Sequence, residues 1–464
     1  MKRGKPAISV VKSEPAVQSA PREKIEVDER GLADTPFLIL TVLLVAIGVI
    51  VLFSASYARA YVDKGNAAYY FVRQAGFAVS GIIIMLVVSR INYQAWRAAS
   101  FLILAGAILF LIAVPLVGTE EKGATRWINL GFVSFQPSEL AKVGMVLTFA
   151  AMMSMWKDRM QTLRYGVVPY VLIMGVIAVL LYLEPHLSAT MIILGVGVIM
   201  MYLGGTDKKW LILGGVLVAL LLVVYLATKG YSADRITAWL HPEQDASDKG
   251  YQIIQSRYAI GSGGLTGLGF GKSRQKYLYL PEEHNDYIFA IACEELGFIG
   301  AMVIITLFVL LIVRGYWIAM HARDRFGALT VAGLITLLAL QVFLNIGVVS
   351  NFLPATGISL PFFSYGGTAL WVNLAEMGII LGVSRQNENN IALRQARRRS
   401  VGRKMAVSVQ SGCRSVSHNT GRWRCGRPGP CRGCAATAKP PALRRSSAPA
   451  RRRRARSPGH CSGP

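Results

Sequence analysis

The stretch YQIIQSRYAIGSGGLTGLGFGKSRQKYLYLPEEHNDYIFAIACEELGFIG, from Tyr251 to Gly300, differs from the sequence on either side of it. It is rich in glycine, charge and aromatic side chains, and it separates long apolar runs. A membrane protein rarely places so polar a segment between spans without a use for it. Near its end, Asp286 precedes a hydrophobic run, which puts a carboxylate at the membrane surface. We therefore expect this stretch to carry function.

The rest of the chain is more apolar than a soluble protein. Of its 464 residues, 53% are hydrophobic, and the mean hydropathy is +0.43, whereas soluble domains are about 45–50% apolar. The apolar residues lie in runs long enough to cross ~30 Å of hydrocarbon. These runs are 36–55, 74–89, 98–117, 138–155, 166–183, 187–204, 210–228, 296–313, 327–349 and 366–384. The pattern predicts an all-α integral membrane protein, a polytopic bundle of about ten transmembrane helices.

The orientation of the bundle follows from lysine and arginine in its short loops. One set of loops carries ten basic residues and the alternate set carries five. The more basic set is expected in the cytoplasm, so both termini are cytoplasmic and the long loop 229–295, between the seventh and eighth spans, is external. No cleavable signal peptide is evident, because residues 1–35 lack a short apolar core. We expect these residues to form a disordered cytoplasmic tail before a membrane domain at 36–385.

The formal charge of +25 belongs to the segment after that membrane domain. From Arg385 onward there are 20 basic residues against the single acid Glu388, which leaves 30 basic and 24 acidic residues in 1–384. Five of the six cysteines also lie there, and Cys431 and Cys434 have metal-like spacing without a second pair to complete a zinc site. A basic arm on anionic lipid or nucleic acid is one interpretation. We favour disorder over 386–464, a frame artefact after about 405, and no nucleic-acid partner.

Charged residues at the edge of the fourth run form the first candidate site outside the opening stretch. Pro137 or Ser138 is expected to begin a helix, which places Glu139 and Lys142 three residues apart on one face. They form either a structural ion pair or a cation near an anionic substrate, positioned by the glutamate. Arg126 lies just before them.

Three further places put polar groups where lipid makes them costly. Glu184 and His186 lie in a tight external turn and either bind protons or metal or simply cap the turn. The amides Gln341, Asn345 and Asn351 precede a segment, 354–368, in which prolines and glycines forbid a regular helix. This segment either has a purely structural role or forms a cavity wall. Glu376 in the last run has no evident partner in the sequence.

The glycines of the opening stretch invite a phosphate-loop interpretation, but their spacing excludes it. A Walker A motif needs glycine five residues before Gly271, and position 266 is threonine. Gly267 and Gly269 also lack the third glycine of a dinucleotide fingerprint. Glycine still lets backbone amides approach an anion closely, so a pyrophosphate cradle of another kind remains open. Asp286 has two open interpretations, which are a helix N-cap and a carboxylate that acts as a general base or holds a divalent cation.

Several motifs together resemble the SEDS family of bacterial cell-wall synthases, which includes FtsW, RodA and SpoVE. In family order they are Arg126-Trp-Ile with Gln136-Pro-Ser-Glu-Leu-Ala-Lys142, Gly250-Tyr-Gln with Gln255-Ser256, Ala259-Ile-Gly-Ser-Gly-Gly264, Leu280-Pro-Glu with His284-Asn-Asp-Tyr-Ile-Phe-Ala290, Glu294-Glu-Leu-Gly297, and Pro354-Ala-Thr-Gly-Ile-Ser-Leu-Pro361 with Ser364-Tyr-Gly-Gly. Gln275-Lys276 is more similar to the FtsW and SpoVE branch than to RodA.

Two positions depart from the family pattern. Glu184-Pro-His186-Leu-Ser stands where many members carry Gln-Pro-Asp-Leu-Gly, so no role for an acid at position 186 is carried over. Thr368 stands where serine is usual, which keeps the hydroxyl. The segment after about residue 405 resembles nothing in the family.

The resemblance implies a peptidoglycan glycosyltransferase that polymerises lipid II on the outer face of the cytoplasmic membrane, at the division septum, with a class B penicillin-binding protein and other divisome proteins. Asp286 falls on the family's essential external aspartate and would be the catalytic base. Inversion by direct displacement would release undecaprenyl pyrophosphate, which needs cations around it. The substrate-binding candidates are Arg73, Arg126, Glu139, Lys142, Lys272, Lys276 and Ser364. A divalent cation, Mg²⁺ or Mn²⁺, could share the task with Asp286 as its ligand.

The alternative function is a flippase for lipid II, which ten spans, intramembrane charges and an uncharged broken segment would also suit. A scaffold that recruits other wall enzymes is a third possibility, but it leaves Asp286 without a task.

Overall fold

The computed structural model describes residues 31–121, 124–129, 131, 134–184, 186–216, 239–245 and 249–386. Several expectations therefore lie outside the described residues. These expectations concern most of the two predicted disordered tails (residues 1–30 and 387–464), residues 217–228 of the seventh span, and residues 229–238 at the start of the external loop.

Long helices account for most of the described chain, in agreement with the predicted fold class. The helices are α1 (Thr35–Lys64), α2 (Tyr69–Val88), α3 (Tyr93–Val117), α4 (Pro137–Met155), α5 (Leu163–Gly166), α6 (Val168–Leu183), α7 (Leu187–Leu203), α10 (Lys249–Ser262), α11 (Ile288–Met320), α12 (Arg325–Val349) and α13 (Gly367–Arg385). Two 3₁₀ turns, η1 (Lys157–Arg159) and η2 (Pro242–Asp245), lie in the connections.

The described helices match the predicted spans. Eight segments are long and apolar enough to cross a membrane, with α5 and α6 counted as one. The sixth predicted span is the shorter helix α7, and the seventh begins as helix at 208–216 and continues outside the described residues. The eighth span, α11, begins eight residues before the apolar run that predicted it, because the polar end of the opening stretch joins the helix.

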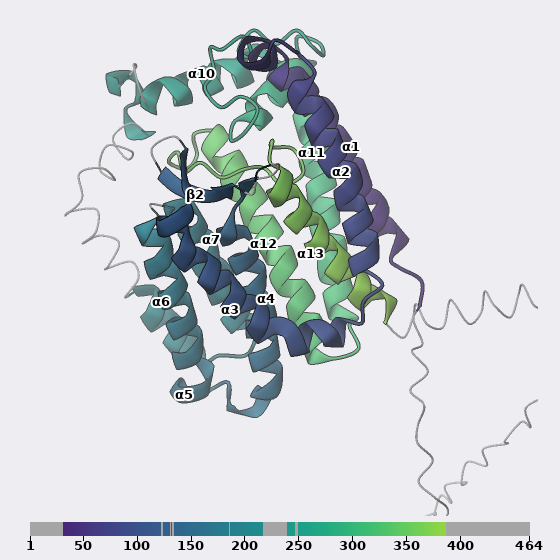
Figure 1. Ribbon diagram of the computed structural model, residues 1–464, viewed down its shortest axis with the longest axis vertical. Coiled ribbons are helices and arrows are strands. Elements are labelled where there is room, and N and C mark those ends of the chain that lie inside the picture. The colour runs from purple at the N-terminus through teal and green to yellow at the C-terminus, as the bar shows by residue number, and fades with distance from the viewer. Residues whose placement is uncertain are drawn as a thin grey trace, which may run out of the picture. The chain divides into compact units, whose positions relative to one another are not determined.

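The centre of the bundle is formed by α4, α12 and α13 (Figure 1). In the most apolar part of α4, 83% of residues are buried inside the protein, and in α12 and α13 the share is 72%. The corresponding share in α2 is only 22%. The outer helices therefore present their remaining apolar surface to lipid, whereas the central ones bury both apolar and polar side chains.

One end of the bundle holds both described ends of the chain. Asp34 caps α1 by accepting from Phe37 N at 3.0 Å, and Arg314 of α11 donates to its two carboxylate oxygens at 3.0 and 2.7 Å. The backbone nitrogen of Gly31 donates to the carbonyl of Arg385 at 2.5 Å. These contacts bring α1, α11 and α13 together at the end that the basic loops predict to be cytoplasmic.

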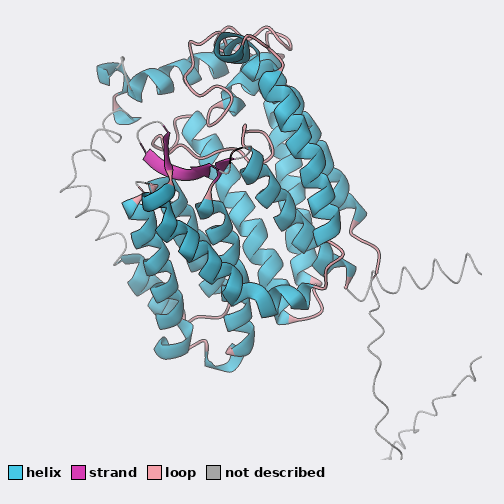
Figure 2. Ribbon diagram, viewed as in Figure 1, coloured by secondary structure: helices cyan, strands magenta, loops and turns pink. Residues whose placement is uncertain are grey.

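At the other end a small antiparallel sheet and α10 lie over the helix tips (Figure 2). The strands are β1 (Thr119–Glu121), β2 (Ala124–Asn129) and β3 (Ser134–Phe135), in the order β1-β2-β3. No alternating pattern predicted this sheet. It carries the arginine segment that precedes α4 and so fixes where Arg126 lies.

The glycine-rich part of the opening stretch packs into a break in α11. Gly297 has φ +69° and ψ −171° inside that helix. The carbonyls of Glu294 and Glu295 accept from Leu268 N and Gly269 N, at 3.0 and 3.1 Å, across the break. The glycines thus allow two backbones to approach closely, and this part of the loop is held by its own chain.

We call this contact between residues 264–276 and the break in α11 the clasp. Two carboxylates complete it. Glu294 accepts from Ser273 Oγ at 2.5 Å and from Arg274 N at 2.9 Å. Glu295 pairs with Lys276 at 3.1 Å and accepts from Ser54 Oγ of α1 at 2.6 Å. The backbone amides of 273–275 therefore donate to carboxylates of the protein itself, and those of 267–269 donate to backbone carbonyls.

Replacing Gly267 with alanine is expected to destabilise the fold. Its φ is +81°, and a Cβ there would lie 2.1 Å from the Glu295 carbonyl oxygen. The cost should be about 1–3 kcal/mol or more, measured as a lower melting temperature in detergent. Gly261→Ala is the matched control, because a Cβ there meets nothing within 4 Å; equal melting temperatures for the two variants would contradict the close approach.

Candidate functional site

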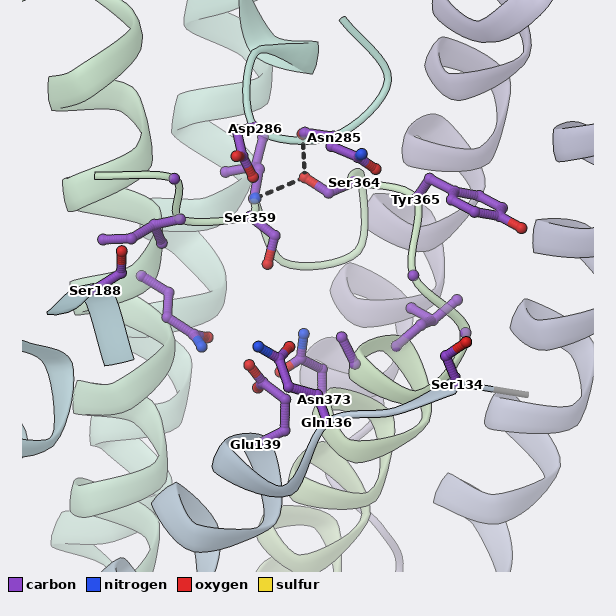
Figure 3. Close-up of a pocket in the computed structure, with 18 of the residues that line it drawn as sticks. Ser134, Gln136, Glu139, Ser188, Asn285, Asp286, Ser359, Ser364, Tyr365 and Asn373 are labelled. Carbon is purple, nitrogen blue, oxygen red and sulfur yellow. Dashed lines mark hydrogen bonds between the residues drawn. The ribbon is translucent and has the colours of Figure 1, made fainter. Parts of the chain in front are cut away.

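A cavity of about 460 Å³ opens at the end of the bundle that carries the sheet and α10. Its lining comes from α2, the sheet, α4, α7, the segment before α11, α12, the broken segment before α13, and α13 itself (Figure 3). Six of the eight predicted site residues line it, namely Arg73, Arg126, Glu139, Lys142, Asp286 and Ser364.

Lys272 and Lys276 lie outside this lining. Lys272 is exposed on the clasp loop. Lys276 is buried and donates to Ser54 Oγ, to the Gly271 carbonyl and to Glu295. The ammonium group of Lys276 is thus committed to holding the clasp, and a substrate in the cavity would not reach it without breaking that pair.

Asp286 lies on the wall formed by the segment before α11. The helix begins at Ile288 and its N-cap residue is Tyr287, so the interpretation of Asp286 as the N-cap residue is wrong. The backbone turns sharply before it, with Glu282 at φ +58°. A Cβ on Gly357 would lie 3.3 Å from Asp286 Oδ2, so the carboxylate lies directly against the broken segment.

The broken segment 354–366 is braced against the Asp286 turn by hydrogen bonds. Asn345 of α12 donates to the Asp286 carbonyl at 2.8 Å and to the Ile358 carbonyl at 2.6 Å. Ser364 donates to the Asn285 carbonyl at 2.7 Å and accepts from Leu360 N at 2.7 Å (Figure 3). The segment is therefore irregular, as its prolines predict, and it forms a cavity wall.

The ion pair of α4 lies across the cavity from Asp286. Lys142 Nζ is 2.8 Å from Glu139 Oε2, and both side chains are buried. Figure 3 shows Glu139 beside Asn373 and Gln136, on the side opposite Asp286. Glu376 of α13 is buried near this pair and interacts electrostatically with both of its members, which the sequence could not show.

Two arginines approach the cavity from its sides. Arg73 of α2 donates to Tyr69 Oη at 3.2 Å and stands over the Phe77 ring, 5.8 Å from its centroid. Arg126 of β2 donates through Nε to the Glu184 carbonyl at 3.4 Å. With Lys142 they bring three cationic groups to one polar chamber, which suits an anionic ligand.

The turn between α6 and α7 holds two buried titratable groups outside the spans. Burial raises the pKa of Glu184 to about 8, although Arg126 opposes the shift. Burial lowers the pKa of His186 to about 3, and Arg126 and Lys142 add to that effect. At neutral pH His186 is therefore an uncharged imidazole in the cavity wall.

Sequence reasoning did not select several residues that line the cavity. They include Tyr70, Ser188 and Asn373. Asn373 is an amide within an apolar run, and that cost in lipid is the signal that could have found it. Tyr70 carries no such signal, because its position depends on how distant segments meet.

A divalent cation would find one or two carboxylates here. Among the described residues, no group of three or more histidine, cysteine, aspartate or glutamate side chains forms a metal cage. Mg²⁺ is commonly held by one or two carboxylates together with substrate phosphates. Asp286 fits that mode, with the remaining ligands supplied by the substrate and water.

The fold and the cavity define a polytopic helical membrane protein with a charged chamber at one end of its bundle. The FtsW/RodA/SpoVE family model, described as cell cycle protein, matches residues 34–389. The chain belongs to this family.

Relatives match over most of their length. A probable peptidoglycan glycosyltransferase FtsW of Trichlorobacter lovleyi is 40% identical over 354 residues, which cover 76% of this chain and 93% of that protein. The stage V sporulation protein E of Bacillus subtilis is 38% identical over 354 residues, covering 76% and 97%.

Solved structures agree with the fold. A chain from a study titled "Structural coordination of polymerization and crosslinking by a peptidoglycan synthase complex" is 27% identical, with a TM-score of 0.65 over 76% of this chain and 98% of that one. The rod shape determining protein RodA of Thermus thermophilus is 26% identical, with a TM-score of 0.58 over 77% and 98%.

Lys142→Met is expected to destabilise the protein by about 3–5 kcal/mol, because it leaves the buried Glu139 charge unpaired. The double variant Glu139→Gln/Lys142→Met removes both charges and should recover most of that loss. Melting temperatures of Lys142→Met, Glu139→Gln, the double variant and the wild type complete the cycle. A double variant no more stable than Lys142→Met would show that the two charges do not depend on each other.

The stability of the protein is expected to fall as pH rises from 6.5 through 8 because of Glu184. Its pKa is raised from 4.5 to about 8, so the folded state holds a proton that the unfolded state has released. The lowered pKa of His186 acts only below 6.5, with the opposite sign. Glu184→Gln should flatten the decline between pH 6.5 and 8 in thermal unfolding, and an unchanged slope would exclude Glu184 as its source.

Proposed function

We propose that this protein is a peptidoglycan glycosyltransferase that polymerises lipid II into glycan strands. The observation that carries the proposal is the single cavity that places Asp286 on one wall and Arg73, Arg126 and Lys142 around the others. The family membership and the names of the relatives support it.

The arrangement suits a displacement at the anomeric carbon of a sugar on a polyprenyl pyrophosphate. The C4 hydroxyl of the acceptor sugar gives its proton to Asp286, and its oxygen forms a bond to C1 of the donor sugar. The bond from C1 to the phosphate oxygen breaks, and undecaprenyl pyrophosphate leaves with the electron pair. Lys142 and the arginines stabilise the negative charge on this leaving group.

One base is sufficient for such a reaction. Direct displacement inverts the anomeric carbon, so no carboxylate needs to form a covalent intermediate. Glu139 is paired with Lys142 at 2.8 Å, and its task is to position that ammonium group. Ser364 holds the Asp286 turn through the Asn285 carbonyl, so its contribution to substrate binding is indirect.

A divalent cation bound by Asp286 and the substrate pyrophosphate is compatible with these residues. When bound, it would supply positive charge at the leaving group. The cationic side chains line the cavity without it and orient the pyrophosphate by themselves.

The cavity end of the bundle faces outward in this proposal, and both termini face the cytoplasm. Ten of the fifteen basic residues in the short loops lie at the opposite end. The protein acts at the division septum, with a class B penicillin-binding protein that crosslinks the new strands. The similarity to a chain of a peptidoglycan synthase complex supports such a partner.

Asp286→Ala is expected to abolish polymerisation of labelled lipid II by the purified protein with its partner transpeptidase. The loss should exceed about a hundredfold, since a positioned base contributes 10²–10⁴-fold. Asp158→Asn is the control, because Asp158 is an exposed carboxylate in the connection between α4 and α5. Melting temperatures establish that both variants fold.

Full polymerisation by the folded Asp286→Ala protein would contradict the assigned base. The flippase alternative makes a different prediction for sealed vesicles. There, translocation of labelled lipid II without polymerisation under any condition would favour transport over synthesis.

A further inference from the structure

His186 lines the cavity and has a ring nitrogen that bonds to no described residue. It is the N-cap of α7, it is 8% exposed, and it lines the cavity. Its Nδ1 is buried and has no hydrogen-bond partner among the described residues. A buried ring nitrogen without a partner costs free energy, so a ligand in the cavity is a reasonable source of that partner.

The backbone around His186 is fixed and connected to the Asp286 wall. His186 N donates to the Leu181 carbonyl at 2.9 Å. Two residues later, Ser188 donates to the carbonyl of Thr356. The next residue of that segment, Gly357, is the one that lies against Asp286. Figure 3 shows Ser188 and Asp286 on the lining of the same cavity.

The groups that face His186 keep it uncharged. Arg126 of β2 and Lys142 of α4 both act on it electrostatically, and its burial works in the same direction. Glu184 of the same turn is itself largely protonated at neutral pH, because burial raises its pKa to about 8. A neutral imidazole offers one donor and one acceptor, which suits a hydroxyl or an amide better than a phosphate.

We propose that His186 is a specificity-determining residue that hydrogen-bonds an uncharged polar group, a hydroxyl or acetamido group, of the sugar attached to the pyrophosphate. This inference rests on the proposed function. Arg126 and Lys142 attract the pyrophosphate, and the sugar bonded to it must then lie within a few ångströms of the same two side chains. The neutral ring beside them distinguishes a lipid-linked sugar from the bare lipid pyrophosphate.

The presence of histidine instead of an acidic residue at position 186 has a physical consequence. An aspartate at 186 would lie near Arg126 and Lys142 and would neutralise part of their charge. With histidine the two cations remain available to the pyrophosphate, and the sugar is bound by a neutral group instead.

The test measures binding without turnover, in the Asp286→Ala background, with fluorescent lipid II and with undecaprenyl pyrophosphate as a competitor. His186→Leu should weaken lipid II binding about tenfold, the effect of one lost hydrogen bond in a buried site, and should leave undecaprenyl pyrophosphate binding within twofold. His186→Asn, which keeps a donor and an acceptor, should retain lipid II binding within about threefold. His321→Leu is the control, because His321 is exposed beyond the far end of α11.

Equal weakening of both ligands by His186→Leu would overturn the proposal, as would unchanged lipid II binding. If the leucine variant does not fold, the asparagine variant is compared with His186→Asp. The aspartate variant should then weaken undecaprenyl pyrophosphate binding more than the asparagine variant does, and equal binding would overturn the proposal. A wild-type protein that binds both ligands as expected but does not polymerise lipid II would contradict the proposed function alone.

Discussion

The site depends on one amide side chain in the middle of the bundle. Asn345 donates both of its protons to backbone carbonyls, one at Asp286 and one at Ile358. Irregular backbone at membrane depth is stable only where its polar groups find partners within the protein. Asn345 donates to backbone carbonyls of two irregular segments at once. It therefore fixes the position of the proposed base relative to the broken segment 354–366, on the wall opposite the ion pair. A site of this kind is preorganised, because its geometry does not wait for the substrate.

The same constraint explains the glycine-rich stretch. The break at Gly297 interrupts the hydrogen bonding of α11, and backbone groups of 264, 265, 268 and 269 replace the missing partners. The Glu294 and Glu295 carboxylates then hold the following amides and Lys276. A motif that looks able to bind phosphate is an internal clasp, and it leads directly into the turn that carries Asp286. Its buried charges, on Glu294, Glu295 and Lys276, stabilise the position of the site.

The sequence predicts those features that depend on neighbouring residues. Hydropathy placed one apolar run in each long helix, although α1 and α11 extend seven to nine residues beyond their runs. The three-residue spacing of Glu139 and Lys142 predicted their ion pair, because this property is also local. The pairing of Lys276 with Glu295 is not local, and neither is the electrostatic interaction of Glu376 with the α4 pair. Apolar periodicity gave no sign of the sheet that carries Arg126, since its strands are short. Asp286 looked like a helix cap because the pattern does not show that α11 begins after Tyr287.

The arrangement of the two cavity walls has a chemical reason. In a direct displacement, the attacking hydroxyl and the leaving group lie on opposite sides of the anomeric carbon. The structure pairs Lys142 with Glu139 on one wall and sets Asp286 against Gly357, at φ +68°, on the other. A side chain at position 357 would occupy the space beside the Asp286 carboxylate, so the glycine keeps that space for the acceptor hydroxyl. The cations can then draw the pyrophosphate to their own wall while the base stays on the side from which the hydroxyl must attack.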